Sequence, residues 1–246
     1  PSPSHPEFPV ANFPTHVLGA TGAGIVAATA LASTDLLPLP SIAAGVGLTV
    51  LGGVFPDVDS DHSDAITLVF DTLAVAVAIP LTLLVVPALG MVAGLGLLGA
   101  TWLFLRYVAI WPFRVFTVHR GRFHSLPAGA LLAAAVAAIG SRAVGLDPVQ
   151  AWLMGGLFAL GFVVHLTLDE LFSVDLGNRK IKASFGTALK LFERGDWLGY
   201  GLLYAAVAVA FAAAPPTQPV AQAVAAVEVR WLPPEGALPL DPLAAR

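Results

Sequence analysis

Long apolar runs recur along this chain, and several reach the roughly 18 to 20 residues that a bilayer-spanning helix needs. Hydrophobic residues make up 57% of the 246 residues and charged residues only 11%. An average soluble domain has about 25% charged residues. The mean hydropathy is +0.82. These features predict an all-α integral membrane protein, a single polytopic bundle of about seven transmembrane helices.

Composition also excludes several classes of protein and site. Cysteine is absent, so the chain has no disulfide bonds and no thiolate metal ligands. The formal net charge of −4 offers no basic face to a phosphate backbone, and we expect no nucleic-acid partner. Residues 1–15 contain prolines and no lysine or arginine, unlike a cleavable signal peptide. We therefore expect the first apolar run to serve as the targeting signal.

The apolar runs and the residues between them predict helices at residues 16–34, 41–55, 65–87, 88–110, 125–142, 148–172 and 197–213. The third and fourth are joined by a very short loop and should form an antiparallel hairpin, with Pro80 a candidate kink. Residues 1–14 form an N-terminal extension and 15–214 the transmembrane domain. Residues 215–246 hold seven prolines and no spanning run, so we expect a mostly extended tail.

Basic residues indicate how the chain crosses the membrane, because cytoplasmic loops carry an excess of lysine and arginine. With a cytoplasmic N-terminus, the cytoplasmic loops are 56–64, 111–124 and 173–196, and the only basic residue in the opposite loops is Arg142. The cytoplasmic loops then contain Arg114, Arg120, Arg122, Arg179, Lys180, Lys182, Lys190 and Arg194. The pattern predicts a multi-pass membrane protein with its N-terminus in the cytoplasm.

Four polar clusters fall at helix ends on this same predicted face. They are His16, "PDVDSDH" from residue 56, "HRGRFHS" from residue 119 and "HLTLD" from residue 165. Ionisable residues in or against a bilayer are costly, and by default they mark a functional site.

Two of the clusters contain aspartates at spacings that suit metal ligands. His165 and Asp169 are four residues apart on one helix and share a face, as two ligands of one metal would. An intramembrane hydrogen-bonded pair is the alternative. Asp57 and Asp59 follow the helix-stopping Pro56, and an extended backbone would point both carboxylates the same way, as in a bridge between two cations. The alternative is a solvated acidic loop, a description that fits Asp61, His62 and Asp64 better.

The cluster at residue 119 is basic as well as histidine-rich. His119 and His124 are five apart and lie on different faces of any helix, so Gly121 must let the loop turn if they are to converge. Arg120 could clamp an oxyanion with two hydrogen bonds, whereas Arg122 is expected to face elsewhere. A purely topological basic loop is the alternative. His16 alone would be read as an interfacial helix-end residue.

Together the clusters offer nitrogen and oxygen ligands without sulfur, which suits one or two divalent ions: zinc first, with manganese or iron as alternatives. The candidate ligands are His16, Asp57, Asp59, His119, His124, His165 and Asp169. A catalytic metal lowers the pKa of its water towards neutrality. Asp57 or Asp169 is then a candidate general base, and Arg120 a candidate oxyanion donor.

The same motifs carry a family resemblance. The order of "TH" (Thr15, His16), "PDVDS" (Pro56 to Ser60), "HRGRFHS" and "HLTLD" resembles the YdjM-type family of LexA-regulated, inner-membrane, metal-dependent hydrolases. The likeness spans about residues 15 to 172. It implies a polytopic helical protein of the bacterial inner membrane with a catalytic divalent metal and a poorly defined substrate. Ser60 stands where that family often has histidine, which leaves the role of His62 open.

The segment "KIKASFGTALKLFERGDW", residues 180–197, predicts an amphipathic basic helix at the membrane surface. It could roof a site that takes lipid headgroups, or it could be an ordinary helix between two spans. The leading hypothesis is metal-dependent hydrolysis of a membrane lipid or lipid-linked phosphoester. A ceramidase-like amide or ester hydrolase, a metal-ion carrier and a non-catalytic metal-binding regulator are the alternatives. The oligomeric state is not predicted.

Overall fold

The computed structural model describes residues 13–59, 64–109, 122, 124–175, 180–181 and 189–227. Helices dominate these residues. In chain order the elements are α1 (Phe13–Ala32), α2 (Leu39–Val54), the 3-10 helix η1 (Phe55–Asp59), α3 (Asp64–Leu103), the π-helix η2 (Phe104–Ala109), α5 (Leu126–Ile139), the π-helix η3 (Gly140–Val144), α6 (Pro148–Ser173), β1 (Val174–Asp175), β2 (Lys180–Ile181), α7 (Trp197–Ala213) and α8 (Gln218–Ala225).

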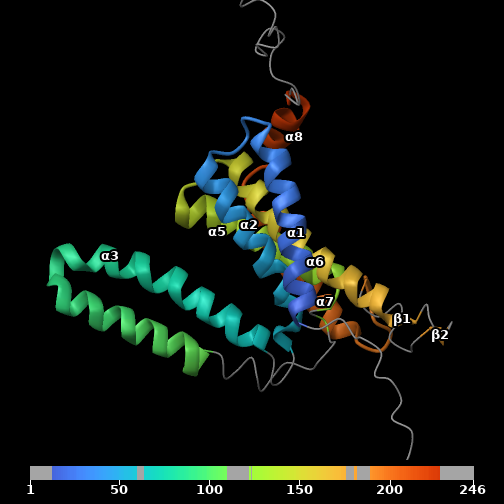
Figure 1. Ribbon diagram of the computed structural model, residues 1–246, viewed down its shortest axis with the longest axis horizontal. Coiled ribbons are helices and arrows are strands. Elements are labelled where there is room, and N and C mark those ends of the chain that lie inside the picture. Colours follow the sequence, from blue (N-terminus) through green and yellow to red (C-terminus); the bar gives the residue numbers. More distant parts are fainter. Residues whose placement is uncertain are drawn as a thin grey trace, which may run out of the picture.

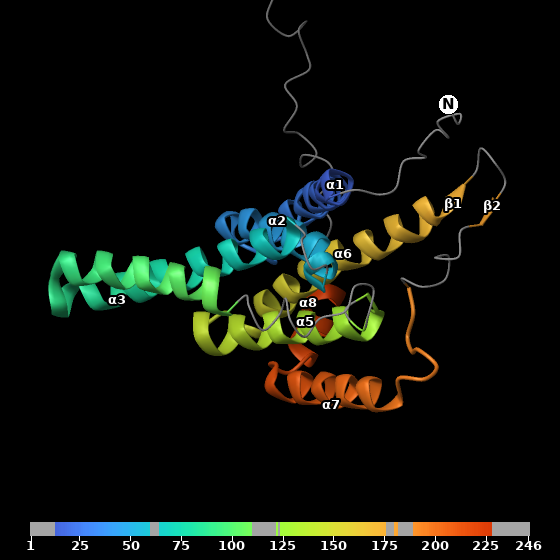
Figure 2. The same ribbon diagram turned by 90° about the horizontal axis from the view of Figure 1, so that it is seen from below.

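Helix α6 is the centre of a bundle and packs against α1, α2 and α5, while α7 packs on the outside of α5 (Figures 1 and 2). The buried core between α5 and α6 includes Ala128, Phe158, Phe162 and Leu166. Asp147 begins α6 by accepting hydrogen bonds from the backbone N–H groups of residues 149 and 150, at 2.9 and 3.0 Å. This cap satisfies donors that the first turn of a helix leaves unpaired.

Small residues bring the bundle helices into close contact. A methyl group added at Gly161 of α6 would collide with the backbone carbonyl of Thr49 in α2, and one added at Gly52 would collide with the carbonyl of Phe158. A methyl group added at Gly53 would collide with the side chain of Ala20 in α1. Membrane helices approach closely through such residues because lipid provides no hydrophobic drive for association between them.

Helix α3 is a hairpin that extends away from the bundle (Figures 1 and 2). Its two arms are separated at Gly90, whose φ of 83° only glycine adopts readily, and the helix continues through Pro80, the candidate kink. The arms are joined by a hydrogen bond of 3.4 Å from Thr82 to the Gly94 carbonyl and by an ion pair between Asp71 and Arg106. The predicted antiparallel hairpin is confirmed, with its turn a few residues later than expected.

Five helices among the described residues are long and apolar enough to cross a membrane: Phe13–Ala32, Leu39–Asp57, Gly90–Val108, Leu126–Val144 and Pro148–Phe172. Helix α7 has 17 residues, or about 26 Å against a hydrocarbon core of about 30 Å. With α8, across a bend of 71°, it gives a sixth candidate. All seven predicted helices form, but the structure supports five or six spans. The protein is an all-α polytopic membrane bundle.

Two expectations for the C-terminal part need correction. The amphipathic helix predicted over residues 180–197 is not helical at its described ends: Lys180–Ile181 pairs antiparallel with Val174–Asp175, and residues 189–196 form bends and a turn. Those backbones hydrogen-bond to neighbouring segments, which replaces helical pairing. The tail is not wholly extended either, because α8 forms within it. Its proline occupies the first turn, where proline is tolerated.

Candidate metal centre

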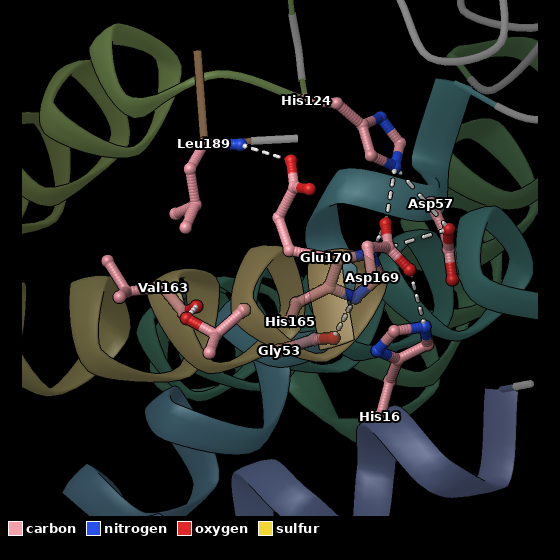
Figure 3. Close-up of polar contacts among 10 residues, drawn as sticks. His16, Gly53, Asp57, His124, Val163, His165, Asp169, Glu170 and Leu189 are labelled. Carbon is pink, nitrogen blue, oxygen red and sulfur yellow. Dashed lines mark hydrogen bonds and ion pairs between the residues drawn. The ribbon is translucent and has the colours of Figure 1, made fainter. Parts of the chain in front are cut away.

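Five of the predicted site residues meet at one end of the bundle. His16 lies near the start of α1, Asp57 in η1 just after α2, His124 just before α5, and His165 and Asp169 near the end of α6. Because α1, α2, α5 and α6 alternate in direction, these chain positions coincide in space (Figure 3). The four separate sequence clusters therefore contribute to one site.

The two carboxylates lie between the three imidazoles. Asp169 Oδ2 is 3.7 Å from His124 Nε2 and 3.5 Å from His165 Nε2, and its other oxygen, Oδ1, is 3.3 Å from His16 Nε2. Asp57 Oδ1 is 3.7 Å from His124 Nε2 and 3.6 Å from His165 Nε2. Each carboxylate thus faces more than one histidine, as a carboxylate in a metal site does.

The ring orientations aim the Nε2 atoms at this cluster. His165 Nδ1 lies 2.7 Å from the Gly53 carbonyl oxygen, an acceptor, so Nδ1 carries the proton and Nε2 presents a lone pair. His16 stacks on His165 with ring centroids 3.7 Å apart. Among the described residues, His165 Nε2 and His16 Nδ1 are buried atoms without a hydrogen-bond partner. A buried polar nitrogen normally has a hydrogen-bond partner. His165 Nε2 has none within the described part of the chain and faces the carboxylates of Asp57 and Asp169 at a longer distance.

The spacing of the donors fits a metal ion. A tetrahedral ion with bonds of roughly 2.1 Å separates its ligand atoms by roughly 3.4 Å, and the contacts of His124 and His165 with the two carboxylates range from 3.5 to 3.7 Å. Two overlapping groups have donor atoms within 4.8 Å of one another: His16 with Asp57 and His165, and His124 with His165 and Asp169. The residues present therefore suit a divalent ion with nitrogen and oxygen ligands.

Burial supports the same interpretation. The side chains of His16, His124 and His165 are 3%, 2% and 0% exposed, and those of Asp57 and Asp169 are 21% and 13% exposed. Two carboxylates held this close to a bilayer are costly unless positive charge compensates them. A divalent cation among them would supply that charge.

The remaining predicted residues are not tested by this geometry. His119 and Arg120 lie outside the described residues, as does His62. Asp59 ends η1, but its side chain is not described.

Arg122 pairs with Asp196, which caps α7. Its Nε donates to Oδ2 at 2.5 Å and its Nη2 to Oδ1 at 3.1 Å. This two-point contact holds the pKa of the Asp196 carboxyl below its usual range and raises the pKa of Arg122.

Two participants were not predicted from the sequence. The Gly53 carbonyl orients His165, and nothing in a run of apolar and small residues marks a backbone oxygen for that role. Glu170 is the other: it is buried directly beside Asp169 and accepts a hydrogen bond from the Leu189 N–H at 3.3 Å. The signal in the sequence is an acidic residue within an otherwise apolar helix, which is costly unless it has a role.

Comparison with known proteins identifies a family for this chain. A family model described as YdjM inner membrane protein matches residues 11–177. No curated protein and no solved structure shows a match. The matched region holds α1, α2, α5 and α6 and all five of the clustered residues. The chain belongs to the YdjM inner membrane protein family.

Proposed function

We propose that this protein is a metal-dependent hydrolase of a membrane lipid or lipid-linked phosphoester. One observation carries the proposal: three buried histidines and two carboxylates from four separate segments of the chain meet at one end of a membrane bundle. A closed structural ion needs only four ligands, and the five clustered residues exceed that number before Asp59 and His119 are considered.

The residues that would hold the ion are His16, Asp57, His124, His165 and Asp169. Bound there, a divalent ion such as zinc supplies Lewis acidity that lowers the pKa of water and polarises a phosphoryl oxygen. The carbonyl of Gly53 keeps the His165 ring in the tautomer that presents Nε2.

Different side chains of the protein would accept the proton and stabilise the developing negative charge. Asp57 is the better general base, because its side chain is 21% exposed against 13% for Asp169 and an attacking water reaches it more readily. It would accept the proton as the water oxygen bonds to phosphorus, and the bond to the leaving oxygen would break as that proton passes on to the leaving oxygen. Arg120 would donate two hydrogen bonds to the anionic phosphoryl oxygens.

The position of the cluster indicates the substrate class. Asp57 is the last residue of its candidate span, and Asp169 lies three residues before the end of its own at Phe172, a rise of about 4.5 Å. A site so near the ends of the candidate spans would lie at the level of lipid headgroups, not at the midplane where a carrier keeps its ions. This location favours hydrolysis of a lipid over ion transport.

The proposal is tested by incubating the purified protein, loaded with zinc or manganese, with a membrane lipid extract and following the products by mass spectrometry. We expect release of a phosphorylated headgroup or a lipid alcohol, abolished in Asp57→Asn. Asp147→Asn, which changes a carboxylate at the opposite end of α6, should keep the activity. Fatty acids released without phosphoester products would indicate amide or ester cleavage. A metal-loaded protein that cleaves no lipid would contradict the proposal.

A further inference from the structure

The residues around His124 are tied to a segment far along the chain, residues 189–196, called here the clasp. The Leu126 N–H donates to the Lys190 carbonyl at 3.0 Å, and Ser125 forms a parallel bridge with Lys190. These contacts lie immediately after His124. The clasp lies beyond residue 177, where the family match ends.

Glu170 attaches the clasp to α6. The residue is 9% exposed, and its Oε1 accepts a hydrogen bond from the Leu189 N–H at 3.3 Å. In Figure 3 the Asp169 carboxylate points towards the histidines, whereas the carboxylate of the adjacent Glu170 points towards Leu189. A buried carboxylate is costly to keep, so a specific role for it is expected.

The other end of the clasp is held by Arg122 and Asp196. The Arg122 guanidinium contacts both carboxylate oxygens of Asp196, which also caps α7 by accepting from the Gly199 N–H at 3.2 Å. The Ser125 hydroxyl donates to the Arg122 carbonyl at 2.5 Å and closes the turn that contains His124. His124 is therefore bracketed by contacts on both sides.

We infer that the clasp holds His124 at the metal centre and that Glu170 is the positioning residue that anchors it. His16 and His165 are set by the helices that carry them, whereas His124 precedes α5 on an extended backbone, with φ of −150° and ψ of 151° at Ser125. A ligand on such a segment needs outside support to keep its geometry. The inference rests on the metal centre of the proposed function and assigns a part of that site to the chain beyond the family match.

The test measures cobalt(II) binding, by titration and by its visible absorption spectrum, in the purified full-length protein. Glu170→Leu removes the acceptor, and we expect cobalt affinity to fall by roughly 10 to 100-fold, the range for lost support of a ligand, with a changed spectrum. Glu170→Gln keeps an acceptor oxygen and should retain most of the affinity. Asp196→Ala releases the other end of the clasp and should weaken binding in the same direction, so a Glu170→Leu variant that fails to fold does not end the test.

Measurements in a His124→Ala protein separate a role of Glu170 in positioning His124 from an effect on general stability. If Glu170 acts through His124, Glu170→Leu should cause no further loss of affinity in a His124→Ala protein. Asp147→Ala removes the cap of α6 at the far end and should lower thermal stability while leaving the cobalt spectrum unchanged. Unchanged affinity in Glu170→Leu and Asp196→Ala, or a full loss on top of His124→Ala, overturns the inference. If His124→Ala and His165→Ala also bind cobalt normally, the metal centre itself is wrong.

Discussion

His165 Nδ1 lies 2.7 Å from the carbonyl oxygen of Gly53, a contact between α6 and α2. This one hydrogen bond fixes which nitrogen of His165 carries the proton, and so it directs the Nε2 lone pair at Asp57 and Asp169. The orientation of a central candidate ligand is thus set by a backbone atom of another helix.

Removing candidate ligands should remove the metal and leave the membrane protein in place. His165→Ala and His124→Ala should each lower zinc affinity by more than about 100-fold, because losing a ligand costs at least as much as losing its support. Span hydrophobicity is almost unchanged, so both variants should remain in the membrane fraction. Metal content of the purified proteins, measured by mass spectrometry, checks this. Wild-type metal content in both variants would leave only a hydrogen-bonded cluster.

Gly161 should tolerate no side chain, because a methyl group there meets the Thr49 carbonyl of α2. We expect Gly161→Ala to destabilise the bundle by about 1 to 3 kcal/mol, as overpacking does. Since Gly161 lies one turn before His165, separation of α2 and α6 should also weaken metal binding. Unfolding in mixed detergent and zinc titration measure both effects. Gly156→Ala, on the same helix with open space around it, is the matched control. Equal stability of the two variants would contradict the close packing.

The charge distribution predicts that the site faces the cytoplasm. Reporters fused after residue 60, 118 or 185 should read cytoplasmic, because the excess of lysine and arginine lies in those loops. A paired phosphatase and fluorescent-protein reporter distinguishes the two sides. Periplasmic phosphatase activity from the fusion at residue 118 would reverse the orientation.

Arg120 is expected to serve the reaction and not the fold. Arg120→Lys keeps the positive charge but replaces a planar two-donor group with a point charge. Turnover of the lipid substrate should fall by roughly 10² to 10³-fold, the range for losing one transition-state donor, with expression and metal content unchanged. Arg142→Lys, in the opposite loop, is the control and should keep full turnover. If Arg120→Lys also keeps full turnover, Arg120 contributes only to the orientation of the protein in the membrane.

Much of the architecture was predictable because helices form from local sequence. The run predicted at 148–172 is α6, Pro148–Ser173, and the run predicted at 197–213 is α7. The i,i+4 spacing of His165 and Asp169 predicted that both lie on one helix face, and His165 Nε2 is 3.5 Å from Asp169 Oδ2. The amphipathic pattern of residues 180–197 failed at its described ends because backbone pairing with β1 and with Ser125 competes with the helix there.

Hydrophobicity and spacing, which act over one or two turns of chain, were enough to predict the membrane class, the helices and the polar residues at their ends. The packing of the helices was needed to show that Gly53 orients His165, that Glu170 contacts the clasp and that five candidate ligands lie together: His16, Asp57, His124, His165 and Asp169. The contact between Gly53 and His165 depends on how closely α2 and α6 cross at Gly52 and Gly161. Contacts between residues so far apart in the chain leave no periodic signal in the sequence.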